Sequence, residues 1–224
     1  MGRVLGWHTR VGDLGLRLLV LHLLWIAWTL RGGVVLGLLP ATAAVQAVVR
    51  RDVLHGTDDP DRGPLRQEFA AAWRRELVPA NVLGYVVAGG WAVLLLDRRL
   101  LGVADLGVAG PVLAGLLTVL TVVAFAVTAV LPALAAHFDE GPARLLRRAL
   151  VLVAARPAHA LAHTVVVGAV LCLYYLVPGL VPVLGVALPA YLSFTTLWGS
   201  GVLPAPARPA APRPVPSHLA RRAT

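Results

Sequence analysis

The sequence predicts an all-α, polytopic transmembrane helical bundle. Of its 224 residues, 58% are hydrophobic and only 14% are charged, with a mean hydropathy of +0.77, whereas about a quarter of the residues in an ordinary soluble domain are charged. Five apolar runs approach or exceed the ~20 residues with which a helix crosses a bilayer. They lack the alternation of apolar and polar residues that is typical of a membrane β-barrel. We therefore expect a bundle of five membrane-spanning helices.

The apolar runs set the expected domain organisation. We assign residues 1–13 to an N-terminal tail, 14–200 to the transmembrane helical domain and 201–224 to a disordered tail. The last segment is rich in Pro, Ala and Arg and has no periodic apolar face. The expected spans are 14–39, 78–96, 107–136, 158–177 and 180–198.

The first run has two interpretations. A single crossing would enclose Arg31 and leave the N-terminus outside, whereas a turn at Arg31-Gly32-Gly33 would make residues 14–50 a hairpin and raise the number of spans to six. The hairpin agrees better with the charge rule below, although its first arm, 18–30, is short. A short repeat, LPATAA at 39–44 and LPALAA at 131–136, favours a single crossing that ends at Pro40 as the third run would end at Pro132.

The basic residues indicate the orientation. All twenty are arginines, and they gather in 50–76, 137–157 and the tail, with only Arg98 and Arg99 in the loop between the second and third runs. Because basic segments stay in the cytoplasm, these three stretches and the C-terminus should be cytoplasmic. The net charge of +9 therefore indicates topology, not nucleic-acid binding. The absence of Lys beside abundant Ala, Val, Leu and Gly is typical of a GC-rich genome, and we expect the plasma membrane of a bacterium.

Two basic amphipathic helices are expected at the cytoplasmic interface. From Pro64, the residues Leu65, Phe69, Trp73 and Leu77 recur at four-residue spacing, with arginines off that stripe. The second helix, 142–155, sets Leu145, Leu146, Ala149 and Leu150 against Arg144, Arg147 and Arg148.

Three motifs together resemble a known family. They are HLLWIAWTLRGGVVLGLLPATAAVQAVVRR, PLRQEFAAAWRRELVPANVLG and LPALAAHFDEGPARLLRRALVLVAARP. In this order they are similar to the YesL-like bacterial membrane proteins, a family of unknown function, and the similarity runs from about residue 18 to 197. The first motif is the most specific. The resemblance implies an integral membrane location and, from the gene neighbourhoods of some members, a link to carbohydrate uptake and breakdown. It brings no catalytic residues, and His22 stands where the family commonly has Asn.

Two histidines stand one helical turn apart in the fourth run. His159 and His163 share the spacing of two zinc ligands, but HALAH lacks the glutamate of HExxH and no third ligand follows. Interhelical hydrogen bonding is the simpler interpretation, and a proton or solute pathway is the alternative. The single cysteine, Cys172, excludes an intramolecular disulfide.

A second set of polar residues lies in the first run. Thr42, Gln46 and Arg50 recur at four-residue intervals and form a polar stripe on an apolar helix. This stripe either lines a cavity or faces lipid headgroups or the rest of the bundle, where Thr and Gln hydrogen-bond between helices. His22 would join this set if it pointed into the bundle. The candidate polar cavity or pathway is therefore lined by His22, Thr42, Gln46, Arg50, His159 and His163.

No nucleophile elbow, phosphate loop, paired-carboxylate site or nucleotide signature is present in the sequence. We expect no enzyme, no cofactor and no metal. The expected function is a non-enzymatic accessory or regulatory component in the lipid bilayer, with a membrane transport complex as its partner; carbohydrate uptake enters through family analogy alone. The alternative is a transporter or permease subunit with a polar cavity between the helices. The sequence leaves the oligomeric state open.

Overall fold

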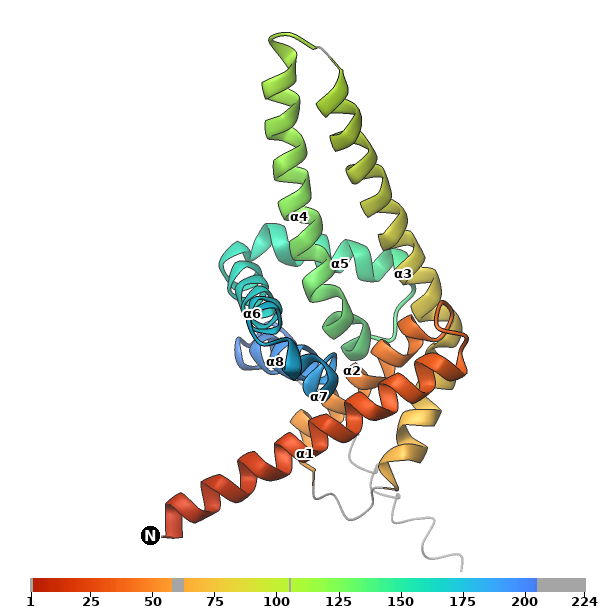
Figure 1. The fold of residues 1–224 in the computed structure, drawn as a ribbon, viewed down its shortest axis with the longest axis vertical. Helices are drawn as coiled ribbons and strands as arrows, with labels where there is room; N and C mark the ends of the chain where they lie inside the picture. Colours follow the sequence, from red (N-terminus) through yellow and green to blue (C-terminus); the bar gives the residue numbers. More distant parts are fainter. Residues whose placement is uncertain (1, 58–62, 105, 205–224) are drawn as a thin grey trace, which may run out of the picture.

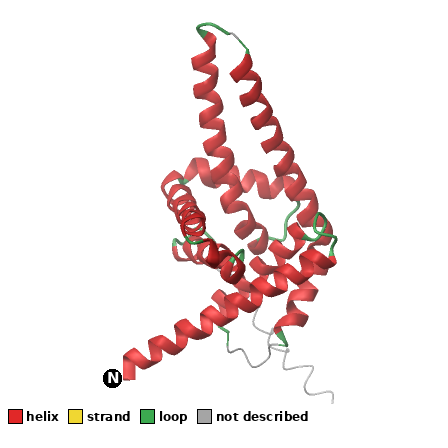
Figure 2. Ribbon diagram, viewed as in Figure 1, coloured by secondary structure: helices red, strands yellow, loops and turns green. Residues whose placement is uncertain are grey.

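The computed structural model describes residues 2–57, 63–104 and 106–204, and every regular element in these ranges is a helix (Figure 2). The all-α prediction is confirmed. The predicted disordered segment lies almost entirely outside the described residues. In chain order the helices are α1 Gly2–Arg31, α2 Leu38–His55, α3 Leu65–Val103, α4 Ala109–His137, α5 Pro142–Ala155, α6 Pro157–Leu176, the 3₁₀ helix η1 Pro178–Leu180, α7 Val181–Leu184 and α8 Ala187–Gly199.

The first apolar run folds as two helices joined by a turn at residues 32–37. Gly33 has φ +70° there, which glycine adopts without strain, and a Cβ at Gly32 would overlap the backbone of Gly37. The break therefore falls where the hairpin interpretation placed it, and Arg31 is exposed at the turn. The alternative crossing that ends at Pro40 is wrong, because Pro40 lies in the first turn of α2, where a proline removes no hydrogen bond. Helix α1 also continues through residues 2–13.

The predicted interfacial helix at 64–77 and the predicted span at 78–96 form one helix of 39 residues, α3. The apolar stripe packs inward as expected, with Phe69 and Trp73 buried. The helix continues through Pro79, and α3 makes with α2 the most extensive helix contact among the described residues; this packing outweighs the local preference for a break. The helix ends at Val103, so Arg98 and Arg99 lie within it and not in a loop.

Helices α4, α5 and α6 agree closely with the sequence. α5 has the predicted bounds, with Leu145 and Ala149 buried and its arginines exposed. It is separated from α6 at Arg156, where φ is −132°, because a residue that precedes proline disfavours the helical region. Helix α4 ends at His137, close to the expected end of the third span at residue 136, so the end at Pro132 that the short repeat implied is wrong. The repeated LPATAA and LPALAA segments lie inside α2 and α4 and do not mark helix ends.

The fifth run is not the continuous span that the sequence predicted. It is divided into η1, α7 and α8. The part formed by η1 and α7 meets α8 at an angle of 76°. Pro182 lacks an amide hydrogen and Gly185 has no side chain, so this segment tolerates the bend. Among the described helices, four are long and apolar enough to cross a membrane, or five if the bent pair counts as one span; α2 is not one of them.

Helix α2 lies at the centre of the bundle and packs against α1, α3, α4 and α8. Val45, Val48 and Val49 are fully buried there, together with Phe69 of α3 and Phe194 of α8. In Figure 1, α3 and α4 rise side by side well beyond the other helices, which gather around the lower part of this pair. We call the upper part, residues 88–121, the distal hairpin.

Candidate functional site

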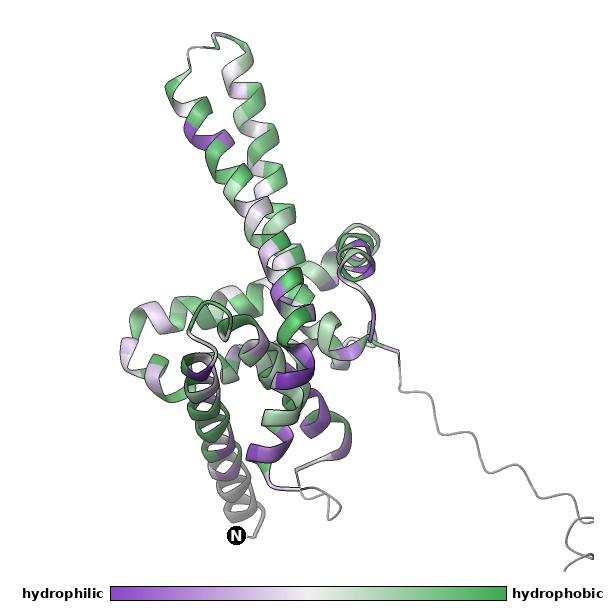
Figure 3. Ribbon diagram, turned by 90° about the vertical axis from the view of Figure 1, so that its right-hand side faces the viewer, coloured by the Kyte–Doolittle hydropathy of each residue, from purple (hydrophilic) through white to green (hydrophobic). Residues whose placement is uncertain are grey.

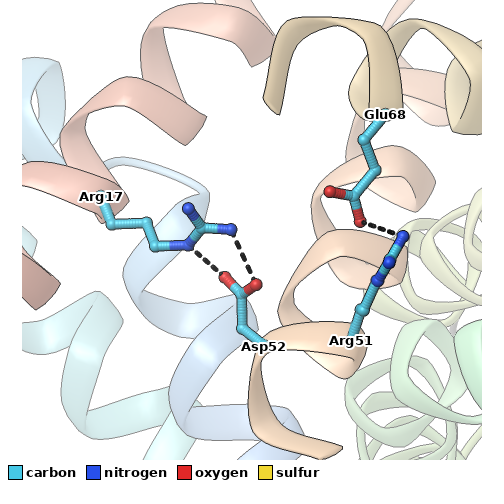
Figure 4. Close-up of polar contacts among 4 residues, drawn as sticks. All are labelled: Arg17, Arg51, Asp52 and Glu68. Atoms are coloured by element: carbon cyan, nitrogen blue, oxygen red, sulfur yellow. Dashed lines mark hydrogen bonds and ion pairs between the residues drawn. The ribbon is translucent and has the colours of Figure 1, made fainter. Parts of the chain in front are cut away.

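Two ion pairs join the first three helices (Figure 4). Arg17 of α1 donates from Nε and a terminal nitrogen to both carboxylate oxygens of Asp52 of α2, at 2.6 and 2.8 Å. Arg51 of α2 lies 3.7 Å from a carboxylate oxygen of Glu68 of α3. The Asp52 side chain is only 8% exposed, and bidentate pairing of this kind fixes orientation as well as charge. These pairs hold the middle of α1 beside the basic end of α2.

His22 lies in the break of the last helical segment. A Cβ at Gly185 would overlap the imidazole ring of His22, and the backbone amide of Val186 donates to its Nδ1 at 3.4 Å. Tyr174 donates its hydroxyl hydrogen to the carbonyl of Gly185 at 2.7 Å. The chain therefore bends around the His22 ring, and only glycine leaves room for it.

His22 is also connected to the predicted polar stripe, through the side chain of Trp25. Trp25 stacks on His22 with 5.5 Å between ring centroids, and its indole nitrogen donates to the Thr42 hydroxyl at 3.0 Å. That hydroxyl in turn donates to the carbonyl of Leu38 at 2.9 Å. Thr42 therefore serves interhelical hydrogen bonding, which is the second of the two roles considered for the stripe.

Gln46 and Arg50, the other two residues of the stripe, each have a buried side-chain atom without a hydrogen-bond partner. Gln46 is 4% exposed and its Oε1 is buried without a partner; the Nε of Arg50 is also buried without one. Burial lowers the pKa of the Arg50 guanidinium, and the neighbouring cation Arg75 lowers it further. Buried polar atoms of this kind usually indicate an unseen partner or water.

The two histidines of α6 lie in different surroundings. His163 is fully buried, and its Nε2 donates to the carbonyl of Ala129 at 3.0 Å with the Ser193 hydroxyl 3.3 Å away. Its Nδ1 has no partner. His159 is exposed. The two side chains therefore do not share one environment. In the described ranges, no three His, Cys, Asp or Glu side chains gather as a metal site would require.

A further polar cluster links α3 to α4 in the distal hairpin, and the sequence analysis missed it. Arg98 donates from Nε to the Thr121 hydroxyl and from a terminal nitrogen to the Thr118 hydroxyl, both at 3.2 Å. Below it, the Trp91 indole donates to Thr128 at 3.0 Å. The available signal was the spacing of Thr118 and Thr121, which puts two hydroxyls on one face of an apolar helix.

Above Arg98, a groove of about 380 Å³ lies between the two helices, a volume within the range of small-ligand pockets. Small residues line much of it, which lets another chain approach closely. The lining residues are Arg98, Leu101, Gly102, Gly110, Pro111, Ala114, Leu117 and Thr118.

The loop before α5 provides a pH-dependent contact. Arg148 donates to both carboxylate oxygens of Glu140, at 2.6 and 2.8 Å, which lowers the pKa of Glu140 and raises that of Arg148. Because the folded-state pKa of Glu140 lies below the unfolded value of 4.5, the pair stabilises the fold above that pH and is lost as the pH falls through the lowered pKa. We expect Glu140→Gln to lower the Tm slightly at neutral pH, with the difference from wild type shrinking below pH 4.5. A difference that persists unchanged in acid would contradict this assignment.

Comparison with known proteins identifies relatives. Residues 18–98 match the family described as "Protein of unknown function, DUF624". The chain is 33% identical over 159 residues to the uncharacterized protein YesL of Bacillus subtilis (strain 168), covering 70% of this chain and 72% of YesL. It is 29% identical over 167 residues to the uncharacterized protein YesV of the same organism, covering 72% and 76%. No solved structure matches. The chain therefore belongs to the YesL-like, or DUF624, family of proteins of unknown function.

Proposed function

We propose that this protein is a non-enzymatic accessory component of the bacterial plasma membrane that binds other membrane proteins through its distal hairpin. The observation that best supports this proposal is the distance to which the distal hairpin extends. It extends past the remaining helices (Figure 1), and its apolar side chains are left uncovered: Val93 is 59% exposed, Val112 71% and Val119 61%. A face of this size and hydropathy fits lipid or another membrane helix.

Polar groups within the hairpin favour protein contacts over simple anchoring. Figure 3 shows a hydrophilic band in its upper part, between stretches coloured as hydrophobic. Charged residues at membrane depth are costly and usually serve a function. The family resemblance supports a transport complex as the partner, with carbohydrate uptake as the class. The arginine distribution supports a cytoplasmic C-terminus, with the distal hairpin directed toward the opposite side of the bilayer.

Photo-crosslinking from the hairpin tests this proposal. A photoreactive residue at Val112 or Val119, in native bacterial membranes, should give protein adducts that mass spectrometry identifies as membrane transport components. The same probe at Leu161 of α6, which is 63% exposed, is the matched control and should give lipid adducts only. Hairpin probes that also yield only lipid adducts would refute the proposal.

A transporter is the second candidate, and the break at Gly185 is the observation that favours it. Discontinuous helices form the substrate sites of many secondary transporters, and here the break encloses the ring of His22. This reading predicts solute uptake by proteoliposomes and its loss in His22→Ala. Uptake that is absent, or unchanged in the variant, would remove it.

A further inference from the structure

Asp97 and Arg98 lie deep in the distal hairpin. Arg98 is bonded to Thr118 and Thr121, which follow Ala109, the first residue of α4, by nine and twelve positions. At a rise of about 1.5 Å per residue, the guanidinium lies roughly 14–18 Å along α4 from the start of that helix. It points toward these hydroxyls and does not extend to the tip.

Beyond Arg99, which is exposed, the described residues up to the tip are apolar or glycine and mostly uncovered. Leu100 is 54% exposed, Val103 84% and Val108 92%. An apolar surface of this extent is unfavourable in water, so this end of the hairpin belongs in hydrocarbon. Asp97 and Arg98 then lie below it at membrane depth, where an uncompensated charge is costly.

Neither side chain has an ion-pair partner among the described residues. The hydroxyls of Thr118 and Thr121 accept hydrogen bonds from Arg98 but carry no countercharge. No ion pair joins Asp97 to Arg98 in the described residues, because the guanidinium is turned toward Thr118 and Thr121. In the described part of the hairpin, Asp97 and Arg98 are therefore an anion and a cation without an ion-pair partner, at the same level as a second cation, Arg99.

We propose that the distal hairpin pairs with the distal hairpin of a second copy of this chain, so that Asp97 of each copy neutralises Arg98 of the other. The arrangement is self-complementary, as a two-fold interface requires. Leu101 lines the groove and lies one helical turn from Asp97, so the carboxylate flanks the groove that Arg98 enters. Gly102, Gly110 and Ala114 let the two backbones approach closely.

A second copy fits better than a lipid phosphate. A phosphate would neutralise Arg98 but leave Asp97 unpaired, and lipid headgroups lie at the bilayer surface, not beneath an apolar hairpin end. This inference rests on the proposed use of the hairpin for protein contacts. It assigns one face of the hairpin to self-association and leaves the other faces for a transport partner.

Exchanging the charges of Asp97 and Arg98 by substitution tests whether two hairpins pair. The experiment uses the purified full-length protein, reconstituted in lipid nanodiscs. Native mass spectrometry should find wild type as a dimer. Arg98→Asp and Asp97→Arg should each weaken dimerisation by at least about tenfold, which corresponds to ~1.4 kcal/mol, while the double exchange Asp97→Arg/Arg98→Asp should restore it. Arg99→Asp makes the same charge change at the neighbouring position and should leave the dimer intact.

Mixing the two single variants provides a test that does not depend on the double exchange. Arg98→Asp has two anions beside Arg99 at this level and Asp97→Arg has three cations, so together they should form a heterodimer. Circular dichroism confirms that each variant is folded. A monomeric wild type, or folded variants that do not recover dimerisation by exchange or mixing, would overturn the pairing. Transport-component adducts from hairpin probes would still support the proposed function in that case, whereas lipid adducts alone would refute both.

Discussion

Replacing Gly185 by alanine is expected to destabilise the protein more than any other single methyl addition in the last helical segment. The new Cβ would overlap the buried His22 ring, and overpacking of this kind costs about 1–3 kcal/mol. The bend would have to open or the ring would have to leave its contact with Val186. The measurement is the Tm of the purified protein in mild detergent.

Gly179→Ala is the matched control, because a Cβ there meets no atom within 4 Å, and its Tm should stay near that of wild type. Removing the ring should relieve the overlap, so Gly185→Ala/His22→Ala should be more stable than the two single effects predict when added. A Gly185→Ala variant as stable as Gly179→Ala would show that His22 does not occupy the break.

Asp52→Asn is expected to lower stability by about 2–4 kcal/mol. It leaves Arg17 without its carboxylate in a setting where the two side chains are 19% and 8% exposed, and an unpaired charge that is largely buried is strongly unfavourable. The loss should separate α1 from α2 first, because this pair joins them. Denaturation in detergent, with protease protection of α1, measures both effects.

Glu76→Gln is the control, since Glu76 pairs at 3.0 Å with an Arg75 side chain that is 69% exposed, and exposed pairs contribute little. Replacing both partners, as in Arg17→Met/Asp52→Leu, should recover most of the stability because no charge then stays unpaired. Equal effects of Asp52→Asn and Glu76→Gln would show that the ion pair does not hold the helices together.

Local signals predicted much of the helical architecture. The arginine and leucine periodicity of 142–155 gave the bounds of α5, and the glycines after Arg31 indicated the turn that the structure contains. The errors fall where tertiary packing decides. Pro79 does not break α3 because α2 packs along it, and the bend at Gly185 depends on a ring that comes from residue 22.

The candidate site was less predictable, because sequence spacing does not give the environment of a side chain. His159 and His163 are one turn apart, yet one is exposed and the other fully buried. Thr42 accepts a hydrogen bond from Trp25, a partner on α1 that its spacing with Gln46 and Arg50 does not indicate. Arg98 was assigned to a loop because the apolar run stopped before it; only the extension of α3 to Val103 places it opposite Thr118 and Thr121.

The depth of the distal hairpin tests the central claim most directly. A single spin label at Val112, in a Cys172→Ser background in lipid nanodiscs, can be compared with one at Arg66, which is exposed on α3 at the end opposite the hairpin. Embedding of the hairpin end predicts that the Val112 label collides with dissolved oxygen and is shielded from a water-soluble nickel complex, whereas the Arg66 label shows the reverse. A Val112 label as accessible to nickel as that at Arg66 would contradict the account.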